Sequence, residues 1–343
     1  MSLTVSPFRP QDRQEWDDFV LRHPHGSPFH LLAWKQSIEQ TFGFRPMYLV
    51  ARNEVVQGVL PLFLVENFLV GKALISSPFA VYGGILAETA EAQAALRDQV
   101  RRLGESLAVD YVELRNAHAE QCVGFAGVSR YVTFTQPVGP GEESLLEALP
   151  KKTRNMVRKA LKNPFVTRRG PDSFQAFESL YARNLRRLGT PSFPRRHFAA
   201  LLENFGERID IREVLLDGQV VAASMNFFFR DQMHTYYAAS DSRYNAQAPN
   251  TYMYFDHLRW AGQSGYRTFD FGRCKRGTGT FEFKRHWGGE MRELPYEVLL
   301  VKRKDLPNFS PLNPRFQTAI KVWQNLPLPL TRLLGPRLIR LFP

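Results

Sequence analysis

The sequence predicts an α+β protein made of two tandem domains of similar design, each with a mixed central sheet flanked by helices. Its 343 residues exceed one average domain and suit two domains of about 150–170 residues each. A high aromatic content, with 27 Phe and 12 Tyr, favours strand-rich cores, because aromatic side chains pack well on pleated surfaces. The same order of predicted elements occurs twice along the chain, which indicates a duplicated architecture.

Both stretches show a helical pattern followed by three predicted strands, a second helix and a short strand. The second stretch begins with two helices, and its first two strands meet at Asp217-Gly218, a pair that favours a hairpin. The predicted elements of the first stretch are residues 30–42, 47–52, 55–65, 73–86, 90–107 and 111–115, and those of the second are 173–188, 195–205, 209–216, 220–230, 233–240, 251–264 and 268–271.

This order is that of a GNAT-like (acyl-CoA N-acyltransferase) core, so we predict two such domains in tandem. The turn-rich segment at residues 138–141 is the predicted boundary. We expect an N-terminal GNAT-like domain at residues 1–140, a C-terminal one at 141–305 and an amphipathic tail at 306–343.

The composition favours a cytoplasmic protein. No stretch has the roughly 18–20 uninterrupted apolar residues that span a bilayer, and the first ten residues lack the features of a secretory signal. Two cysteines, Cys122 and Cys274, lie far apart, which argues for a reducing compartment. The formal charge of +12 and the pI near 9.8 suit an anionic partner, either nucleic acid, a phosphorylated substrate or a membrane surface; a merely solvated basic surface is the alternative.

The densest basic run begins at Lys151. Residues 151–169 hold eight basic side chains and no acidic one. Helical spacing places Arg154, Arg158 and Lys162 on one face and turns Met156, Val157, Ala160 and Leu161 inward. Such a face suits a polyanion or a diphosphate, which Arg binds in forks; a solvated amphipathic helix is the other interpretation.

A polar loop follows the strand predicted at 233–240 and enters a helix at Pro249-Asn250. In a GNAT-like fold this entry is where a donor pyrophosphate would meet free backbone N–H groups. The glycine-rich signature of acetyl-CoA binding is absent here, which leaves the donor open. Asn250 is also expected to cap the helix.

Lys284 is the candidate catalytic residue. It lies between Phe283 and Trp287, so partial desolvation could point its ammonium at a developing oxyanion; a strand of alternating apolar and basic residues is the alternative. His286 could act as a base but equally suits a structural role, and Cys274 has no identifiable catalytic partner. No His, Cys and carboxylate cluster has metal-ligand spacing, so no metal is expected.

Taken together, these segments resemble the FemAB family of tandem GNAT-like transferases, and the resemblance extends from about residue 27 to 289. In its length and its Pro-rich C-terminal tail, the chain is most similar to the FemAB-related proteins of exosortase/PEP-CTERM exopolysaccharide systems. The matching segments are Ser27-Pro28-Phe29…Trp34, Lys152-Thr153-Arg154-Asn155…Arg158-Lys159-Ala160, Tyr237-Ala238-Ala239-Ser240…Pro249-Asn250, Phe269-Asp270-Phe271-Gly272-Arg273 and Phe283-Lys284…Trp287-Gly288.

The resemblance implies transfer of an acyl or aminoacyl group to an amine of a nucleotide- or lipid-linked sugar or another cell-envelope precursor. It implies that Lys284 polarises the acyl carbonyl and that the acceptor diphosphate is bound by Lys152, Arg154 and Arg158, with Tyr237 and Tyr252 nearby. Asn250 and Arg273 complete the expected substrate-binding residues. No cofactor is expected to stay bound; the donor is a co-substrate, namely acyl-CoA, an acyl carrier protein or aminoacyl-tRNA. A FemX-like aminoacyl-tRNA-dependent transferase of peptidoglycan synthesis and a non-catalytic glycan- or nucleotide-binding accessory protein are the alternatives.

The tail at residues 316–343 combines apolar side chains with Lys and Arg, and no acidic residue follows Asp305. This pattern is typical of a segment that lies in a membrane interface, so we expect peripheral contact with the inner face of the membrane. Packing of the leucine-rich face on the protein itself, or across a dimer, is the competing interpretation.

Overall fold

The structure is a computed structural model that describes residues 2–118, 124–307 and 314–343. Its first half contains the predicted helix, strands, helix and strand, preceded by a further strand and helix. The elements of this half are β1 (Thr4–Pro7), α1 (Arg13–Arg22), α2 (Leu32–Phe42), β2 (Arg45–Pro46), β3 (Leu49–Arg52), β4 (Val56–Leu60), β5 (Leu62–Asn67), β6 (Gly71–Ser76), β7 (Leu86–Ala87), α3 (Ala90–Ser106) and β8 (Tyr111–Leu114).

The second half begins with a long strand and the basic helix, and the predicted helices and hairpin follow. Two helices of the tail end the chain. These elements are β9 (Ala126–Pro137), α4 (Glu142–Ala148), α5 (Lys151–Ala160), β10 (Val166–Arg169), α6 (Phe174–Leu188), α7 (Arg195–Phe205), β11 (Ile209–Leu216), β12 (Gln219–Phe229), β13 (Gln232–Ser240), α8 (Pro249–Gln263), β14 (Thr268–Asp270), β15 (Cys274–Lys275), α9 (Gly279–Arg285), β16 (Glu290–Leu300), α10 (Pro314–Asn325) and α11 (Leu328–Ile339).

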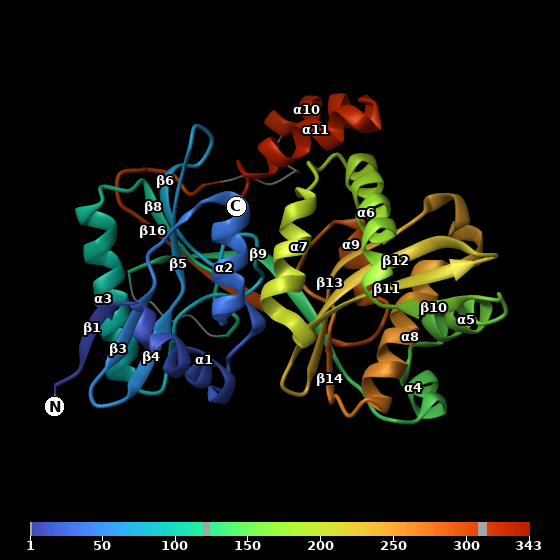
Figure 1. The fold of residues 1–343 in the computed structure, drawn as a ribbon, viewed down its shortest axis with the longest axis horizontal. Coiled ribbons are helices and arrows are strands. Elements are labelled where there is room, and N and C mark those ends of the chain that lie inside the picture. Colours follow the sequence, from blue (N-terminus) through green and yellow to red (C-terminus); the bar gives the residue numbers. More distant parts are fainter. Residues whose placement is uncertain (1, 119–123, 308–313) are drawn as a thin grey trace.

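A mixed sheet runs through both halves (Figure 1). Its strand order is β10-β11-β12-β13-β14-β9-β16-β8-β6-β5-β2, with β15 beside β9, and a second sheet has the order β1-β3-β4-β7. In the second half, α6 and α7 cover one face of the sheet and α8 covers the other. The predicted fold class, an α+β protein of two tandem GNAT-like units, is confirmed.

Strands from distant parts of the sequence join the two halves. β16 pairs antiparallel with β8 along Glu297–Leu300 and with β9 along most of its length, while β9 also pairs with β14. The late strand β16 thus lies between β8 and β9, inside the sheet. The predicted boundary at residue 140 stays a prediction.

Two predicted strands are divided or shortened. The strand predicted at 55–65 is two strands, β4 and β5, which belong to different sheets. Pro61 lies between them, and its missing backbone N–H interrupts a strand ladder. The strand predicted at 73–86 is limited to β6 and β7, because Ser77 and Phe79 have positive φ angles that turn the chain.

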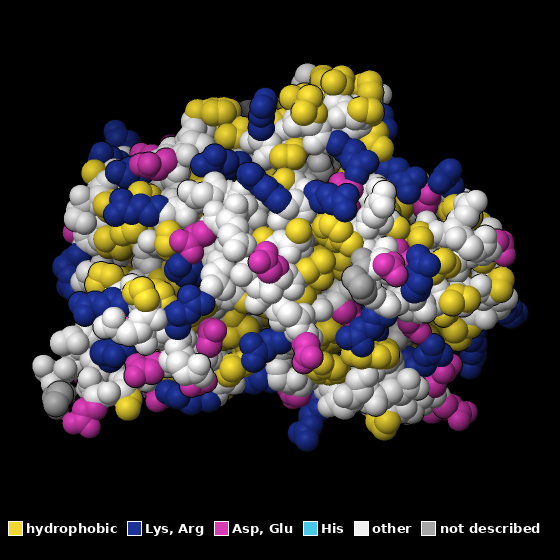
Figure 2. Space-filling model, viewed as in Figure 1, with side chains coloured by type: hydrophobic (Ala, Val, Ile, Leu, Met, Phe, Trp, Pro, Cys, Tyr) yellow, Lys and Arg dark blue, Asp and Glu magenta, His cyan; other side chains and the backbone are white. Residues whose placement is uncertain are grey.

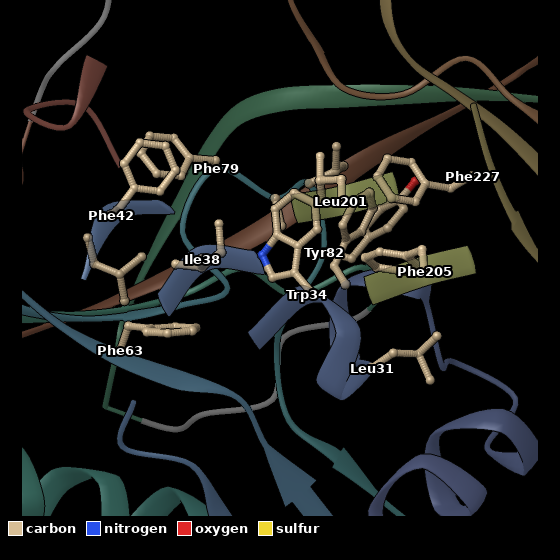
Figure 3. Packing of buried hydrophobic residues seen from close by; sticks show 14 of the residues in the cluster. Leu31, Trp34, Ile38, Phe42, Phe63, Phe79, Tyr82, Leu201, Phe205 and Phe227 are labelled. Carbon is tan, nitrogen blue, oxygen red and sulfur yellow. The ribbon is translucent and has the colours of Figure 1, made fainter. Parts of the chain in front are cut away.

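One aromatic core joins the halves (Figure 3). Trp34 of α2 is fully buried, and its ring centroid lies 6.1 Å from that of Phe227 on β12. Phe205 of α7 lies 4.9 Å from the same ring. Ser37 of α2 donates a hydrogen bond to the carbonyl of Ala200 in α7. Burial of these large rings stabilises the contact between the halves, since each contributes on the order of 1.5–3 kcal/mol.

One detail of the basic segment was predicted wrongly, and the alternative strand at the lysine-bearing segment is not formed. Met156 of α5 is exposed, whereas Thr153, Val157 and Ala160 face inward. The segment around Lys284 is the helix α9 and not an alternating strand. Thr278 begins this helix by accepting a hydrogen bond from the backbone N–H of Phe281, which is a normal N-cap.

The tail packs on the protein and also presents an apolar surface. The indole of Trp323 is buried and donates to the carbonyl of Thr190, and Arg332 pairs with Glu178 of α6. Leu330 and Leu333 are 44% and 65% exposed. Of the helices in residues 2–118, 124–307 and 314–343, none combines the length and the apolar character needed to cross a bilayer.

Candidate active site

The candidate site lies where two parallel strands of the second half diverge. β13 and β14 pair only over Gln232–His234 and Thr268–Asp270. β13 continues beside β12 to Ser240, whereas the chain after β14 turns at Gly272, whose φ of 72° is left-handed and favours glycine. A bulge in the pairing of β12 with β13 lies close by, opposite Met225. Divergence of this kind exposes backbone polar groups that a ligand or a side chain must satisfy.

Lys284 reaches this point of divergence from α9. It is 5% exposed, and its Nζ donates to the carbonyls of Gly272 at 2.8 Å and Arg273 at 3.1 Å. A Cβ atom on Gly272 would lie 3.7 Å from this Nζ and 3.6 Å from the carbonyl oxygen of Thr235 on β13. The ammonium therefore lies against the chain that follows β14, near the point of divergence, and among the described residues it has two acceptors for its three N–H donors.

Burial shapes the charge of this lysine. It lowers the pKa of Lys284 to about 8, against the favourable fields of Cys274 and Asp270. The group is still cationic at neutral pH, but it is poorly solvated. A cation of this kind interacts strongly with negative charge that develops beside it.

Arg273 extends the site toward a cleft between the halves. Its guanidinium lies 4.5 Å from the ring centroid of Tyr131 and donates to the hydroxyl of Tyr296. The cleft has a volume of about 410 Å³. Four cationic side chains line it and one acidic side chain, Glu113, opposes them; the cations are Arg115, Arg130, Arg273 and Lys275. An anionic ligand fits this balance of charge.

The basic helix α5 lies next to α9. Its Thr153 hydroxyl donates to the carbonyl of His286, and Asn163, just past its end, donates to the carbonyl of Gln247 before α8. The helix therefore lies between the lysine-bearing helix and the loop that enters α8. Arg168 and Arg169 are paired with acidic residues on β11. By contrast, the six Lys and Arg side chains of residues 151–162 form no ion pair with any described residue.

The predicted acceptor residues fall into separate groups. Lys152 and Arg158 are exposed on α5, and Arg154 is half-buried. Tyr237 is buried on the α6 and α7 face of the sheet, where its hydroxyl contacts Nε2 of His197 at 2.9 Å. Tyr252 packs on the opposite face. The structure therefore brings Arg273 to Lys284 and α5 to α9, but it does not bring Tyr237 and Tyr252 together.

The expected cap of α8 is corrected by the structure, and the two cysteines and possible metal ligands can be assessed where they are described. Asn250 does not cap α8, because the helix begins at Pro249, two residues before the predicted start, and its N-cap position is Ala248, with no side-chain cap bond. Burial raises the pKa of the Cys274 thiol, which disfavours a thiolate nucleophile. Cys122 lies outside the described residues. Among the residues that are described, no group of His, Cys, Asp and Glu is arranged to hold a metal ion.

Sequence reasoning missed the aromatic wall of the cleft. Tyr131 and Tyr296 lie on β9 and β16, and neither strand was predicted. Their mutual packing, with ring centroids 5.4 Å apart, depends on the antiparallel pairing of segments about 165 positions apart. Local patterns carry no information on such a long-range contact.

Comparison with known proteins agrees with this architecture. Residues 150–285 match the model of the acetyltransferase (GNAT) domain family. No curated protein matches the sequence. Among solved structures, FemX is similar, with a TM-score of 0.71, 16% identity and coverage of 92% of this chain and 100% of its own. L-PGS from Bacillus licheniformis has a TM-score of 0.57 at 10% identity and covers 96% and 98%.

A tandem GNAT protein from the clavulanic acid biosynthesis pathway is also similar, with a TM-score of 0.55, 11% identity and coverage of 89% of this chain and 100% of its own. At these identities the likeness shows the fold. The chain therefore has a tandem GNAT-like fold, and residues 150–285 of its second half match the acetyltransferase (GNAT) domain model.

Proposed function

We propose that this protein is an N-acyltransferase that moves an acyl or aminoacyl group to an amine of a nucleotide- or lipid-linked sugar or another cell-envelope precursor, in exopolysaccharide assembly. The observation that carries the proposal is the buried ammonium of Lys284, held by the carbonyls of Gly272 and Arg273 where the chain leaves β14. Attack of an amine on an acyl carbonyl places negative charge on the carbonyl oxygen. The remaining N–H donor of Lys284 is suited to that oxygen.

The basic surfaces support an acceptor or donor that carries phosphate. The cleft beside Arg273 has an excess of cationic side chains, and α5 offers basic residues that no described carboxylate neutralises. Arg154 and Arg158 are one turn apart, so both can contact one diphosphate. The donor is acyl-CoA, an acyl carrier protein or aminoacyl-tRNA. All three carry phosphate, either at the pantetheine arm that holds the acyl group or in the RNA backbone.

The tail supports a location at the inner face of the membrane. Figure 2 shows hydrophobic side chains with Lys and Arg among them at the top of the view, where α10 and α11 lie. Leu330, Leu333 and Val322 are exposed there. Contact with an anionic bilayer would bring the protein to a lipid-linked acceptor, and each basic residue near the surface contributes about 1 kcal/mol.

The experiment that tests the function supplies each donor class in turn. The purified protein is incubated with acetyl-CoA, acetylated acyl carrier protein or alanyl-tRNA, together with UDP-glucosamine or a bacterial envelope extract. Mass spectrometry then searches for an acceptor heavier by one acyl group. A product that requires the protein supports the proposal, and its absence with all three donors contradicts it in favour of a binding protein.

A further inference from the structure

A second polar cavity, of about 210 Å³, lies between the halves at the start of β13 and β14. Loop residues of the first half, including His25, Tyr82 and His118, face His234, Asp270 and Arg292 of the second half across it. Lys284 does not line this cavity. The two sites are nevertheless adjacent, because the backbone N–H of Gly272 donates to Asp270 while its carbonyl accepts from Lys284.

The cavity contains a buried His–Asp pair. Nδ1 of His234 lies 3.3 Å from Oδ2 of Asp270, and both side chains are at least 96% buried. The hydroxyls of Tyr82 and Thr133 donate to the same carboxylate at 2.6 and 3.0 Å. Burial alone would raise the pKa of Asp270, but hydrogen bonds from His234, Tyr82 and the Gly272 N–H lower it, so the group is a carboxylate.

An ionised Asp270 fixes the tautomer of its neighbour. A carboxylate only accepts hydrogen bonds, so Nδ1 of His234 carries a proton, and in the base form of the ring Nε2 carries the lone pair. That Nε2 is buried and has no hydrogen-bond partner among the described residues. Leaving such an atom unsatisfied costs about 1–3 kcal/mol, so it calls for a ligand with an N–H or O–H group.

Arg292 supplies the complementary charge. Its Nε is likewise buried without a partner in the described structure, and it is the only Lys or Arg among the described residues that line the cavity. The rings of His25 and His118 are tilted relative to one another, with centroids 3.9 Å apart. Burial and the nearby cation lower the pKa of His118 to about 4, so it is neutral at pH 7. The cavity thus offers one fixed cation close to one lone pair.

We propose that this cavity holds the nucleophilic end of the acceptor, an amine close to an anionic group, with the anion on Arg292 and His234 as the proton acceptor for the amine. The inference rests on the proposed acyl transfer and names the base for it. Asp270 is the positioning residue: its carboxylate holds the ring of His234 in the orientation that a general base needs.

The proton and electron balance is simple. As the amine nitrogen forms a bond to the acyl carbon, the carbonyl electron pair moves to oxygen beside Lys284, and the N–H proton passes to Nε2 of His234. The oxyanion then re-forms the carbonyl, and the bond to the thiolate or alkoxide leaving group breaks. That leaving group takes the proton from His234, which returns the ring to its starting form.

The test compares His234→Ala with the parent protein, using the donor that gives product and UDP-glucosamine, whose amine is next to a sugar phosphate. We expect kcat to fall about a hundredfold or more, the usual contribution of a general base. Free imidazole should restore a substantial part of kcat, because it can refill the space. Glu143→Ala is the control: its side chain is exposed on α4, outside this cavity, and kcat should not change.

A second variant, Arg292→Gln, should raise KM for UDP-glucosamine with little change in kcat. Parallel assays with glycine separate a phosphate from a carboxylate as the preferred anion. The assignment of His234 as the base is overturned if kcat is unchanged in His234→Ala. It is also overturned if kcat is lost and imidazole does not restore it, although the variant has a normal thermal melt. Neither result contradicts the proposed transferase activity. His234→Gln replaces the Ala variant if that one does not fold. Absence of transfer by the parent protein contradicts the proposed function, and the base assignment falls with it.

Discussion

Replacement of Lys284 by Met isolates the role of one buried charge. The change keeps the volume of the side chain and removes the ammonium that lies at the carbonyls of Gly272 and Arg273. In comparable sites, one lost oxyanion donor raises the activation barrier by about 2.7–4 kcal/mol. We therefore expect kcat to fall roughly a hundredfold to a thousandfold. Lys284→Arg should also be poor, because a planar guanidinium does not replace a compact ammonium.

The stability of the variant is predictable from the same geometry. Lowering the pKa of Lys284 from 10.5 to about 8 corresponds to about 3 kcal/mol of unfavourable burial, since one pKa unit is about 1.4 kcal/mol. Met removes that cost but leaves two buried carbonyls without their donor, at about 1–3 kcal/mol each. These terms oppose one another, so the free energy of unfolding at pH 7 should change by no more than about 2 kcal/mol.

The pH dependence of stability gives an independent check. Between about pH 8 and 10.5 the unfolded chain still binds the lysine proton while the folded protein has released it, so the stability of the wild type rises with pH. The Met variant lacks this term. Urea unfolding at pH 7 and pH 10 should show the wild type gaining about 2–3 kcal/mol relative to the variant.

The kinetic assay is initial-rate acyl transfer, with Lys304→Met as the control because Lys304 is exposed. Unchanged kcat in a folded Lys284→Met protein would remove the lysine from the mechanism. Equal pH dependence of stability in the two proteins would refute the account of its burial.

Three further outcomes follow from the structure. The ammonium of Lys284 is the reactive form and its pKa is about 8, so kcat/KM should fall as the pH rises above about 8. This decrease should be absent in Lys284→Arg, whose side chain stays charged. A flat pH profile of kcat/KM in the wild type contradicts this. Replacing Arg154 and Arg158 by Ala should raise KM for a diphosphate-linked acceptor and weaken the salt dependence of that KM. If the donor is tRNA, the same change should flatten the salt dependence of RNA binding. Identical kinetics of variant and wild type across a salt series would mean that α5 is a solvated helix with no binding role. Changing the exposed Leu330 and Leu333 to Glu should abolish flotation with anionic liposomes without lowering the melting temperature, and equal flotation would exclude the membrane contact.

Much of the fold was predictable because the relevant patterns are local. The helix at 195–205 and the strand at 209–216 have the predicted bounds, and the hairpin turn at Asp217-Gly218 is present. Apolar periodicity and turn residues determine such elements over a few positions. The basic helix was also located, but Met156, which was predicted to face inward, is exposed because Thr153 and Val157 fill the buried face.

The parts that could not be predicted depend on contacts between distant segments. β16 lies between β8 and β9 because of pairings that span more than 150 residues, and nothing in its own sequence specifies those partners. The pairing of His234 with Asp270 likewise requires the parallel register of β13 and β14. A lone histidine and a lone aspartate in two strands give no local indication that they meet.

The measurement that tests the central claim most directly is the chemical bond formed in the product. The protein is incubated with each of the three donors carrying an isotopically labelled acyl group, and with UDP-glucosamine or envelope extract. The labelled product is then treated with alkaline hydroxylamine, which cleaves oxygen esters and thioesters but spares amides. We predict a labelled product that survives this treatment and that Lys284→Met forms roughly a hundredfold to a thousandfold more slowly. A label that hydroxylamine releases, or equal labelling by the Met variant, would contradict N-acyl transfer at this site.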